Sequence, residues 1–314
     1  MIEVPQHLKG RDFTRVREWN AQDLRAAIDL ADRLKAAQRE GEAHRLLPGR
    51  TLGMIFAKAS TRTRVSFGVG IAQLGGTGLY LTGDELHLGR GEPVRDTALV
   101  LSRYLDALVI RTSAQSEVDD FAAAADIPVI NGLTDSAHPC QALTDVMTIR
   151  ERLGRLEGVR LAYIGDGNNV CASLMVAAAA LGLRFVAATP AGYAPSETTV
   201  EEARALAAAA GGSVEVVEDP REAATGANVL YTDVWTSMGQ EAERERRLRD
   251  FAGFGLDGAL LALSADDSIV LHCLPAHVGE EIAEDVLYGP RSAAWDQAEN
   301  RLHSQKALLA LVVP

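Results

Sequence analysis

Residues 51–64 read TLGMIFAKASTRTR, an apolar run followed at once by hydroxyl and arginine side chains. The apolar run 51–57 predicts a buried strand, and the spacing of apolar residues over 65–74 predicts a helix. The cluster 60–64 therefore lies where a strand ends and a helix begins, at unpaired amides and the positive end of the helix dipole. Three hydroxyls and two guanidinium groups there are typical of a phosphate site. The alternative is an N-cap serine followed by solvated arginines on a surface helix.

Composition limits the class of protein. The chain has 314 residues, enough for two domains, with 24% charged and 47% hydrophobic residues. No apolar run approaches the roughly 20 residues that span a bilayer, and the first five residues lack a signal-peptide pattern. The three cysteines, an odd and sparse set, favour a reducing cytoplasm. A net charge of −12 argues against nucleic acid as a partner.

Strands and helices are predicted to alternate along the whole chain, which indicates an α/β fold with parallel sheets covered by helices on both faces. We expect two domains with the active site in the cleft between them. The first would span 1–137 and include the C-terminal helix 298–314, and the second would span 138–297. The predicted strands are 51–57, 78–81, 106–110, 127–130, 159–164, 184–188, 213–217, 228–231 and 268–271.

In such sheets ligands bind beyond the C-terminal ends of the strands, so the residues that follow each strand are candidates for a site. In the first half these residues are cations or neutral donors, such as Arg111 and His138. In the second half they include Asp233, Asn169 and Ser237, which suit a ligand that carries ammonium groups. The pattern predicts an anion-binding half and an amine-binding half.

Two motifs allow other interpretations. Gly165-x-Gly167 after a strand suggests a dinucleotide site, but the third glycine of that fingerprint is missing and no acidic residue follows the next strand. His272, Cys273 and His277 could bind zinc, although adjacent His-Cys is poor ligand spacing. We therefore expect no cofactor and no metal.

Single residues also have ordinary structural explanations. Cys273 could be a core residue, and His138 could cap a helix. Arg111 could form a surface ion pair, and His87 could be solvated in its long loop.

Six motifs together make the set specific: Ser-Thr-Arg-Thr-Arg at 60–64, His-Pro-Cys-Gln at 138–141, Gly-Asp-Gly-Asn-Asn at 165–169, Asp-Val-Trp-Thr-Ser-Met-Gly at 233–239, His-Cys-Leu-Pro-Ala at 272–276 and Glu-Asn-Arg at 299–301. Ser-Thr-Arg-Thr-Arg at 60–64 and His-Pro-Cys-Gln at 138–141 resemble the carbamoyltransferases in general. Asn169, Asp233, Ser237-Met238-Gly239 and Cys273-Leu274 resemble the ornithine-specific branch of the aspartate/ornithine carbamoyltransferase family. The resemblance covers essentially the whole chain, including Glu-Asn-Arg at 299–301.

The resemblance implies transfer of the carbamoyl group of carbamoyl phosphate to the side-chain amine of L-ornithine, as in arginine biosynthesis. The products would be L-citrulline and phosphate. It implies a carbamoyl phosphate-binding first domain, an ornithine-binding second domain, and a homotrimer or a multiple of trimers. Gly68 departs from the family pattern, which usually has Glu there.

The resemblance also implies roles for single residues. Arg62, Thr63, Arg111 and His138 would polarise the carbonyl oxygen, and Cys273 and Leu274 would guide the attacking amine. His87 would reach the active site of a neighbouring subunit. The implied carbamoyl phosphate site is Ser60, Thr61, Arg62, Thr63, His87, Arg111, His138, Gln141 and Arg301. The implied ornithine site is Asn169, Asp233, Ser237, Met238, Cys273 and Leu274.

Three other functions stay open at this stage. A nicotinamide-linked oxidoreductase would have to bind a dinucleotide. A non-catalytic sensor would bind carbamoyl phosphate without turning it over. A related carbamoyltransferase would accept another amine, such as putrescine or an acylated ornithine.

Overall fold

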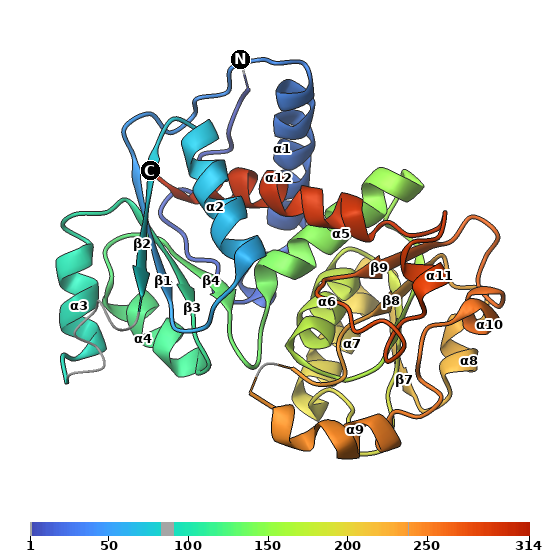
Figure 1. The fold of residues 1–314 in the computed structure, drawn as a ribbon. Helices are drawn as coiled ribbons and strands as arrows, with labels where there is room; N and C mark the ends of the chain where they lie inside the picture. Colours follow the sequence, from blue (N-terminus) through green and yellow to red (C-terminus); the bar gives the residue numbers. More distant parts are fainter. Residues whose placement is uncertain (1, 83–90, 238) are drawn as a thin grey trace. The chain divides into compact units, whose positions relative to one another are not determined.

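The computed structural model describes residues 2–82, 91–237 and 239–314, and Figure 1 shows its elements. The chain divides into two compact units, 1–147 with 299–314, and 148–298. The boundaries fall inside two helices, α5 (Pro139–Leu153) and α12 (Ala294–Val312). None of the helices in the described ranges is both long enough and apolar enough to cross a membrane.

The first unit is built on a parallel sheet with the strand order β2-β1-β3-β4. Leu52 of β1 is paired with Gly78 on one side and Ala107 on the other, so β1 is central. Helices α3 and α4 pack on one face of the sheet through an apolar cluster, and α2 lies on the other face (Figure 1). The elements are α1 (Ala21–Arg39), β1 (Thr51–Phe56), α2 (Thr61–Gln73), β2 (Thr77–Thr82), α3 (Val94–Leu101), β3 (Ala107–Arg111), α4 (Gln115–Ala124) and β4 (Val129–Leu133).

The segment 51–73 forms as its sequence predicts. Five of the six β1 residues are buried, as expected for a strand covered on both faces. Ser60 is the N-cap of α2, and its side chain accepts a hydrogen bond from Thr63 N–H at 3.3 Å. Gly68 lies inside α2, where an added Cβ would meet no described atom within 4 Å.

The second unit contains a five-stranded parallel sheet with the order β7-β6-β5-β8-β9. Helices α6 and α7 pack against each other, and an apolar cluster joins the sheet to α8, α10 and α11. The elements are β5 (Arg160–Ile164), α6 (Asn169–Ala180), β6 (Arg184–Ala188), α7 (Glu197–Ala210), β7 (Ser213–Val217), α8 (Pro220–Ala224), β8 (Val229–Thr232), α9 (Arg244–Asp250), α10 (Gly258–Leu261), β9 (Ile269–His272) and α11 (Glu284–Leu287).

Two parallel sheets covered by helices confirm the predicted α/β class. Some bounds differ from the sequence-based ones. Asn131 and Gly132 belong to β4 rather than following it, and His272 is the last residue of β9. The predicted helix 94–105 ends at Leu101, because the chain turns at 102–104 before β3.

Candidate active site

The candidate site in the first unit begins at the N-terminus of α2. Ser60 precedes the helix, Thr61 is its first residue and Thr63 is buried. The first turn of α2 contains no acidic side chain that would offset the positive end of the helix dipole. Arg62, half-buried, adds a full positive charge to this turn. The helix start therefore offers hydroxyls, backbone N–H groups and charge to an anion.

Arg111 ends β3 and is paired in register with Phe56, the last residue of β1. Its side chain is buried. Burial, together with the smaller effects of the positive charges of Arg301 and Arg62, lowers the pKa of Arg111 to about 10. Guanidinium groups that repel one another in this way favour a bound anion, which would relieve the repulsion.

His138 precedes α5 and is also buried. Burial lowers its pKa well below the usual value, and Arg301, Arg111 and Arg62 act in the same direction. His138 is therefore neutral at pH 7. A neutral imidazole can donate one N–H to a ligand oxygen without adding another positive charge.

Arg301 connects three helices of this unit. Its Nη1 donates to Gln141 Oε1 of α5 at 2.7 Å, and its Nη2 donates to Thr63 Oγ1 of α2 at 3.0 Å. Gln141 is oriented in turn by Asp145, whose Oδ1 accepts from Gln141 Nε2 at 2.7 Å. Residues far apart in the sequence thus meet at one point within the first unit. The predicted site residue His87 lies outside the described residues.

The candidate site in the second unit is centred on Asp233, which follows β8 and is buried. Its Oδ1 accepts from Cys273 Sγ–H at 2.9 Å and from Val234 N–H at 2.8 Å. Its Oδ2 accepts from Asn168 Nδ2 at 2.8 Å. These donors fix the carboxylate plane, and Asp233 remains a buried acceptor suited to an ammonium group.

Asn168, which the sequence-based site did not include, holds Asp233 in place. It is the N-cap of α6, and its Oδ1 accepts from Val170 N–H, Cys171 N–H and the Tyr163 hydroxyl. The predicted residue Asn169 is instead the first helical residue, partly exposed. An asparagine directly before a predicted helix is an N-cap signal that would have identified Asn168.

The segment after β9 carries Cys273 and Leu274, both partly exposed. His272 Nδ1 accepts from Leu274 N–H at 2.9 Å, so its proton lies on Nε2, which donates to Glu281 Oε1 at 3.2 Å. His272 and Glu281 have fully buried side chains. This buried pair anchors a segment in which Leu274 has a positive φ of 56°.

The zinc interpretation grouped the wrong residues. His272 and Cys273 lie with Asp233, whereas His277 lies in a separate group with Glu280 and Glu281. Both ring nitrogens of His272 already have hydrogen-bond partners, so metal binding there would require breaking one of those bonds.

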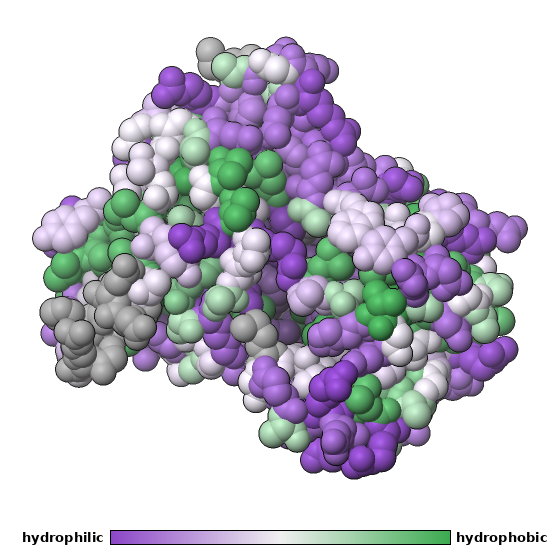
Figure 2. Space-filling model, viewed as in Figure 1, coloured by the Kyte–Doolittle hydropathy of each residue, from purple (hydrophilic) through white to green (hydrophobic). Residues whose placement is uncertain are grey.

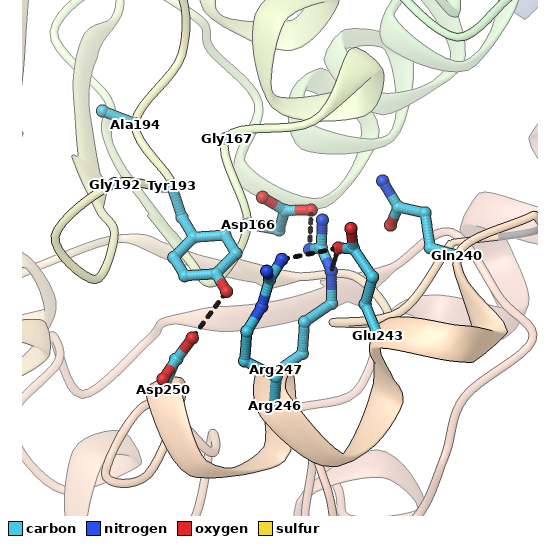
Figure 3. Close-up of a pocket in the computed structure, with 10 residues that line it drawn as sticks. All are labelled: Asp166, Gly167, Gly192, Tyr193, Ala194, Gln240, Glu243, Arg246, Arg247 and Asp250. Atoms are coloured by element: carbon cyan, nitrogen blue, oxygen red, sulfur yellow. Dashed lines mark hydrogen bonds and ion pairs between the residues drawn. The ribbon is translucent and has the colours of Figure 1, made fainter.

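Arg247 of α9 ties together two segments that carry site residues. Its Nη1 donates to Asp166 Oδ2 at 2.8 Å (Figure 3). The same atom donates to the Trp235 carbonyl at 2.9 Å. Asp166 follows β5 and Trp235 follows β8. Burial raises the pKa of Asp166 to about 6, although Arg247 acts in the opposite direction. Asp166 and Arg247 both line a pocket of about 590 Å³, and neither was among the predicted site residues.

Ser237 lies at the end of the segment that follows β8. Its N–H donates to Gln240 Oε1 at 3.1 Å, and its carbonyl accepts from Gln240 N–H at 3.0 Å. These two bonds close the segment on itself. The next predicted site residue, Met238, lies outside the described residues.

The comparisons with known proteins find two matching domain profiles and close relatives. Residues 11–151 match the profile "Aspartate/ornithine carbamoyltransferase, carbamoyl-P binding domain", and residues 157–312 match "Aspartate/ornithine carbamoyltransferase, Asp/Orn binding domain". The chain is 52% identical to an ornithine carbamoyltransferase of Symbiobacterium thermophilum, over 98% of this chain and 99% of that protein. It is 51% identical to an anabolic ornithine carbamoyltransferase of Pyrococcus furiosus, over 98% and 97% of the two chains.

Solved structures give the same result. The ornithine carbamoyltransferase structure from Pyrococcus furiosus superimposes with a TM-score of 0.95 at 50% identity, covering 99% of both chains. That from Gloeobacter violaceus gives 0.87 at 47% identity, covering 98% of this chain and 99% of the other. With two matching domains and half of its residues shared with these relatives, the chain belongs to the aspartate/ornithine carbamoyltransferase family.

Proposed function

We propose that this protein transfers the carbamoyl group of carbamoyl phosphate to the side-chain amine of L-ornithine, giving L-citrulline and phosphate. The observation that carries the proposal is the cluster of positive charge in the first unit. Arg111 and Arg301 are buried, and their positive charges act on each other. Together with Arg62 they lower the pKa of the neighbouring His138, which is neutral. Relatives at about half identity over nearly the full chain bear the same activity in their names.

In the first unit, carbamoyl phosphate would bind by its phosphate at the start of α2. Ser60, Thr61 and Thr63 would supply hydroxyl and backbone donors, and Arg62 and Arg111 would supply charge-assisted ones. His138 and Gln141 would hold the carbamoyl group, and Arg301 would face the same ligand.

In the second unit, ornithine would bind by its α-carbon substituents. The Asp233 carboxylate would accept from the α-ammonium, and Asn169 and Ser237 with Met238 would complete the amino-acid end. Cys273 and Leu274 would guide the side-chain amine. Because the Cys273 thiol donates to Asp233, it carries its proton and would act as a polar wall rather than as a nucleophile.

The chemistry follows from these positions. The uncharged amine attacks the carbonyl carbon, forming a C–N bond while negative charge develops on the carbonyl oxygen. Donors from Arg62, Arg111 and His138 stabilise that charge, at about 2.7–4 kcal/mol per donor in comparable sites. The C–O bond to phosphate then breaks, and the departing phosphate accepts the proton of the amine. Holding both reactants in place contributes roughly 7–11 kcal/mol more.

We further propose a homotrimer, or a multiple of trimers, in the cytoplasm. Exposed apolar side chains on the first unit support self-association. Val65 and Val69 are 54% and 40% exposed, Leu79 on the edge strand β2 is 45% exposed and Tyr104 is 74% exposed. Figure 2 shows hydrophobic residues on the surface over α2. The three cysteines are free, as is usual in a reducing compartment.

The proposed shared site has its own test. If His87 acts in the site of a neighbour, mixed oligomers of two inactive variants, His87→Ala and Arg62→Ala, contain some complete sites. In such a site, Arg62 comes from a His87→Ala subunit and His87 comes from an Arg62→Ala subunit. Mixed subunits should then recover part of the activity. Hybrids as inactive as their parents, or a monomer in sedimentation, would contradict the shared site.

The activity itself is tested by following the carbonyl carbon. With ¹³C-labelled carbamoyl phosphate and L-ornithine, we expect labelled citrulline and phosphate in equal amounts. Binding of carbamoyl phosphate without any citrulline would favour a sensor. Product formed only in the presence of a nicotinamide dinucleotide would favour an oxidoreductase.

A further inference from the structure

The guanidinium of Arg301 is held at all three of its nitrogen atoms. Besides the bonds to Gln141 and Thr63, its Nε donates to Gln305 Oε1 at 2.9 Å. Gln305 lies one turn further along α12, and its side chain is buried like that of Arg301. Three elements, α2, α5 and α12, thus each contribute one acceptor, which fixes both the position and the plane of the group.

These three acceptors are neutral oxygens, two from carboxamides and one from a hydroxyl. They orient Arg301 without bringing a negative charge to it. The positive charge of Arg301 is still felt by its neighbours, since it lowers the pKa of Arg111 and of His138. A carboxylate in place of any of the three would offset the charge that an anionic ligand needs.

Gln305 also connects Arg301 to the helix that begins the phosphate site. The same Oε1 lies 3.0 Å from the hydroxyl oxygen of Ser66 in α2. Ser66 is one turn beyond Arg62, and its hydroxyl lies 2.6 Å from the Arg62 carbonyl. A change at Gln305 would therefore loosen Arg301 relative to the start of α2.

The amide nitrogen of the Gln305 side chain makes no comparable contact among the described residues. This Nε2 atom is buried and has no hydrogen-bond partner in the part of the chain that the structure describes. A buried unsatisfied donor destabilises a fold, so packing alone would favour an apolar side chain of this size. The carboxamide is explained by what its oxygen does.

We propose that Gln305 is a positioning residue for carbamoyl phosphate, which aligns the Arg301 guanidinium through a neutral acceptor. The inference rests on the proposed function. It assigns to Gln305 a selective effect on one substrate: carbamoyl phosphate binding depends on it, and the ornithine half of the site does not.

Two substitutions separate alignment from charge. Gln305→Met is nearly isosteric but removes the acceptor, and we expect the Kd for carbamoyl phosphate to rise about tenfold. Gln305→Glu keeps an acceptor toward Arg301 but adds a negative charge, and we expect a larger rise, about 100-fold. For both variants the KM for ornithine, at saturating carbamoyl phosphate, should stay within about twofold of the parent value.

Two controls isolate the contact. Gln38 of α1 accepts a hydrogen bond from Lys306 of α12, the helix that carries Gln305. The control variant Gln38→Met removes this acceptor and should leave carbamoyl phosphate binding unchanged. In an Arg301→Lys background, the hydrogen bond from Arg301 Nε to Gln305 is already lost. Adding Gln305→Met to that background should therefore change the Kd by less than about twofold.

The measurement is calorimetric titration of the full-length protein with carbamoyl phosphate, with thermal unfolding as a check on folding. Selective weakening in the order parent, Gln305→Met, Gln305→Glu supports the inference. Parent-like binding by Gln305→Met, or binding by Gln305→Glu as tight as by Gln305→Met, overturns it while leaving the proposed function intact. If Gln305→Met does not fold, Gln305→Glu decides alone. Weaker carbamoyl phosphate binding by that variant supports the inference, and parent-like binding overturns it. A parent protein that does not bind carbamoyl phosphate overturns both.

Discussion

The thiol of Cys273 donates a hydrogen bond to Asp233 Oδ1 over 2.9 Å, although 40 positions separate the two residues in the sequence. β8 and β9 are adjacent parallel strands, with Thr232 paired to His272, so the residues that follow them emerge side by side. The strand pairing thus brings a buried carboxylate and a neutral thiol into one polar surface. In the proposed reaction, this surface receives the amino acid.

Asp233→Asn should damage the use of ornithine and leave carbamoyl phosphate binding near normal. The substitution keeps the shape but removes the charge that pairs with an ammonium group, and a hydrogen bond to a charged group contributes about 1.5–3 kcal/mol. We expect the KM for ornithine to rise about 10- to 100-fold. Steady-state kinetics and calorimetry check the two halves separately. Loss of carbamoyl phosphate binding in this variant would show that the halves are wrongly assigned.

Arg62→Ala should act on the opposite half. It removes a charge-assisted donor at the start of α2, where positive charge gathers around Arg111. We expect turnover to fall by about 10²–10³ or more, because the donor is needed most as charge develops in the transition state. Near-normal turnover in a folded variant is the result that this assignment cannot accommodate.

Asn168 allows stability and positioning to be separated. Asn168→Ala loses both the N-cap of α6 and the bond to Asp233, so we expect about 1 kcal/mol less stability and weaker ornithine binding. Asn168→Asp keeps a good N-cap but places a second carboxylate next to that of Asp233. Because the two carboxylates repel each other, this variant should unfold below the parent temperature at neutral pH, and the proton that the pair then shares should leave Asp233 a weaker partner for the ammonium group than in Asn168→Ala. Equal ornithine binding by the two variants would mean that Asn168 serves only the helix.

His138 predicts a pH dependence of stability. Burial and three arginines depress its folded-state pKa, so below about pH 6.5 the unfolded chain binds a proton that the folded protein resists. This contribution to stability is present above that pH and is lost as the pH falls. Relative to His138→Asn, the ligand-free parent should lose up to about 1.4 kcal/mol per pH unit on acidification. Denaturant titrations at several pH values measure the difference, and parallel curves for the two proteins would exclude it.

The sequence predicted what depends on local pattern. The strand predicted over 51–57, the cap at Ser60 and the alternation of elements each have a short-range signal. The structure contains all three, with the strand ending at Phe56. Motif resemblance reached further and indicated the family that the comparisons establish. The individual site roles are proposals that rest on these features together.

The supporting contacts had no such signal. Arg247 lies in a charged stretch that reads as an exposed helix, yet it is buried against Asp166, 81 positions away. Gln305 is significant only because α12 returns to α2, which no local pattern indicates. Asn168 is the exception, since its place before a helix was visible and only its bond to Asp233 was not. Long-range packing decides which polar side chains orient the residues that bind substrate.

The specificity for the amine tests the central claim most directly. Carbamoylated product should be measured with ornithine, putrescine and lysine at saturating carbamoyl phosphate, and kcat/KM compared. Putrescine lacks the groups that Asp233 and its neighbours would bind, and buried polar groups left unpaired can discriminate by about 10⁴–10⁵. Lysine differs by one methylene, a difference of about 1–3 kcal/mol. We predict ornithine to exceed putrescine by several orders of magnitude and lysine by a smaller factor. Putrescine used as well as ornithine would contradict the account.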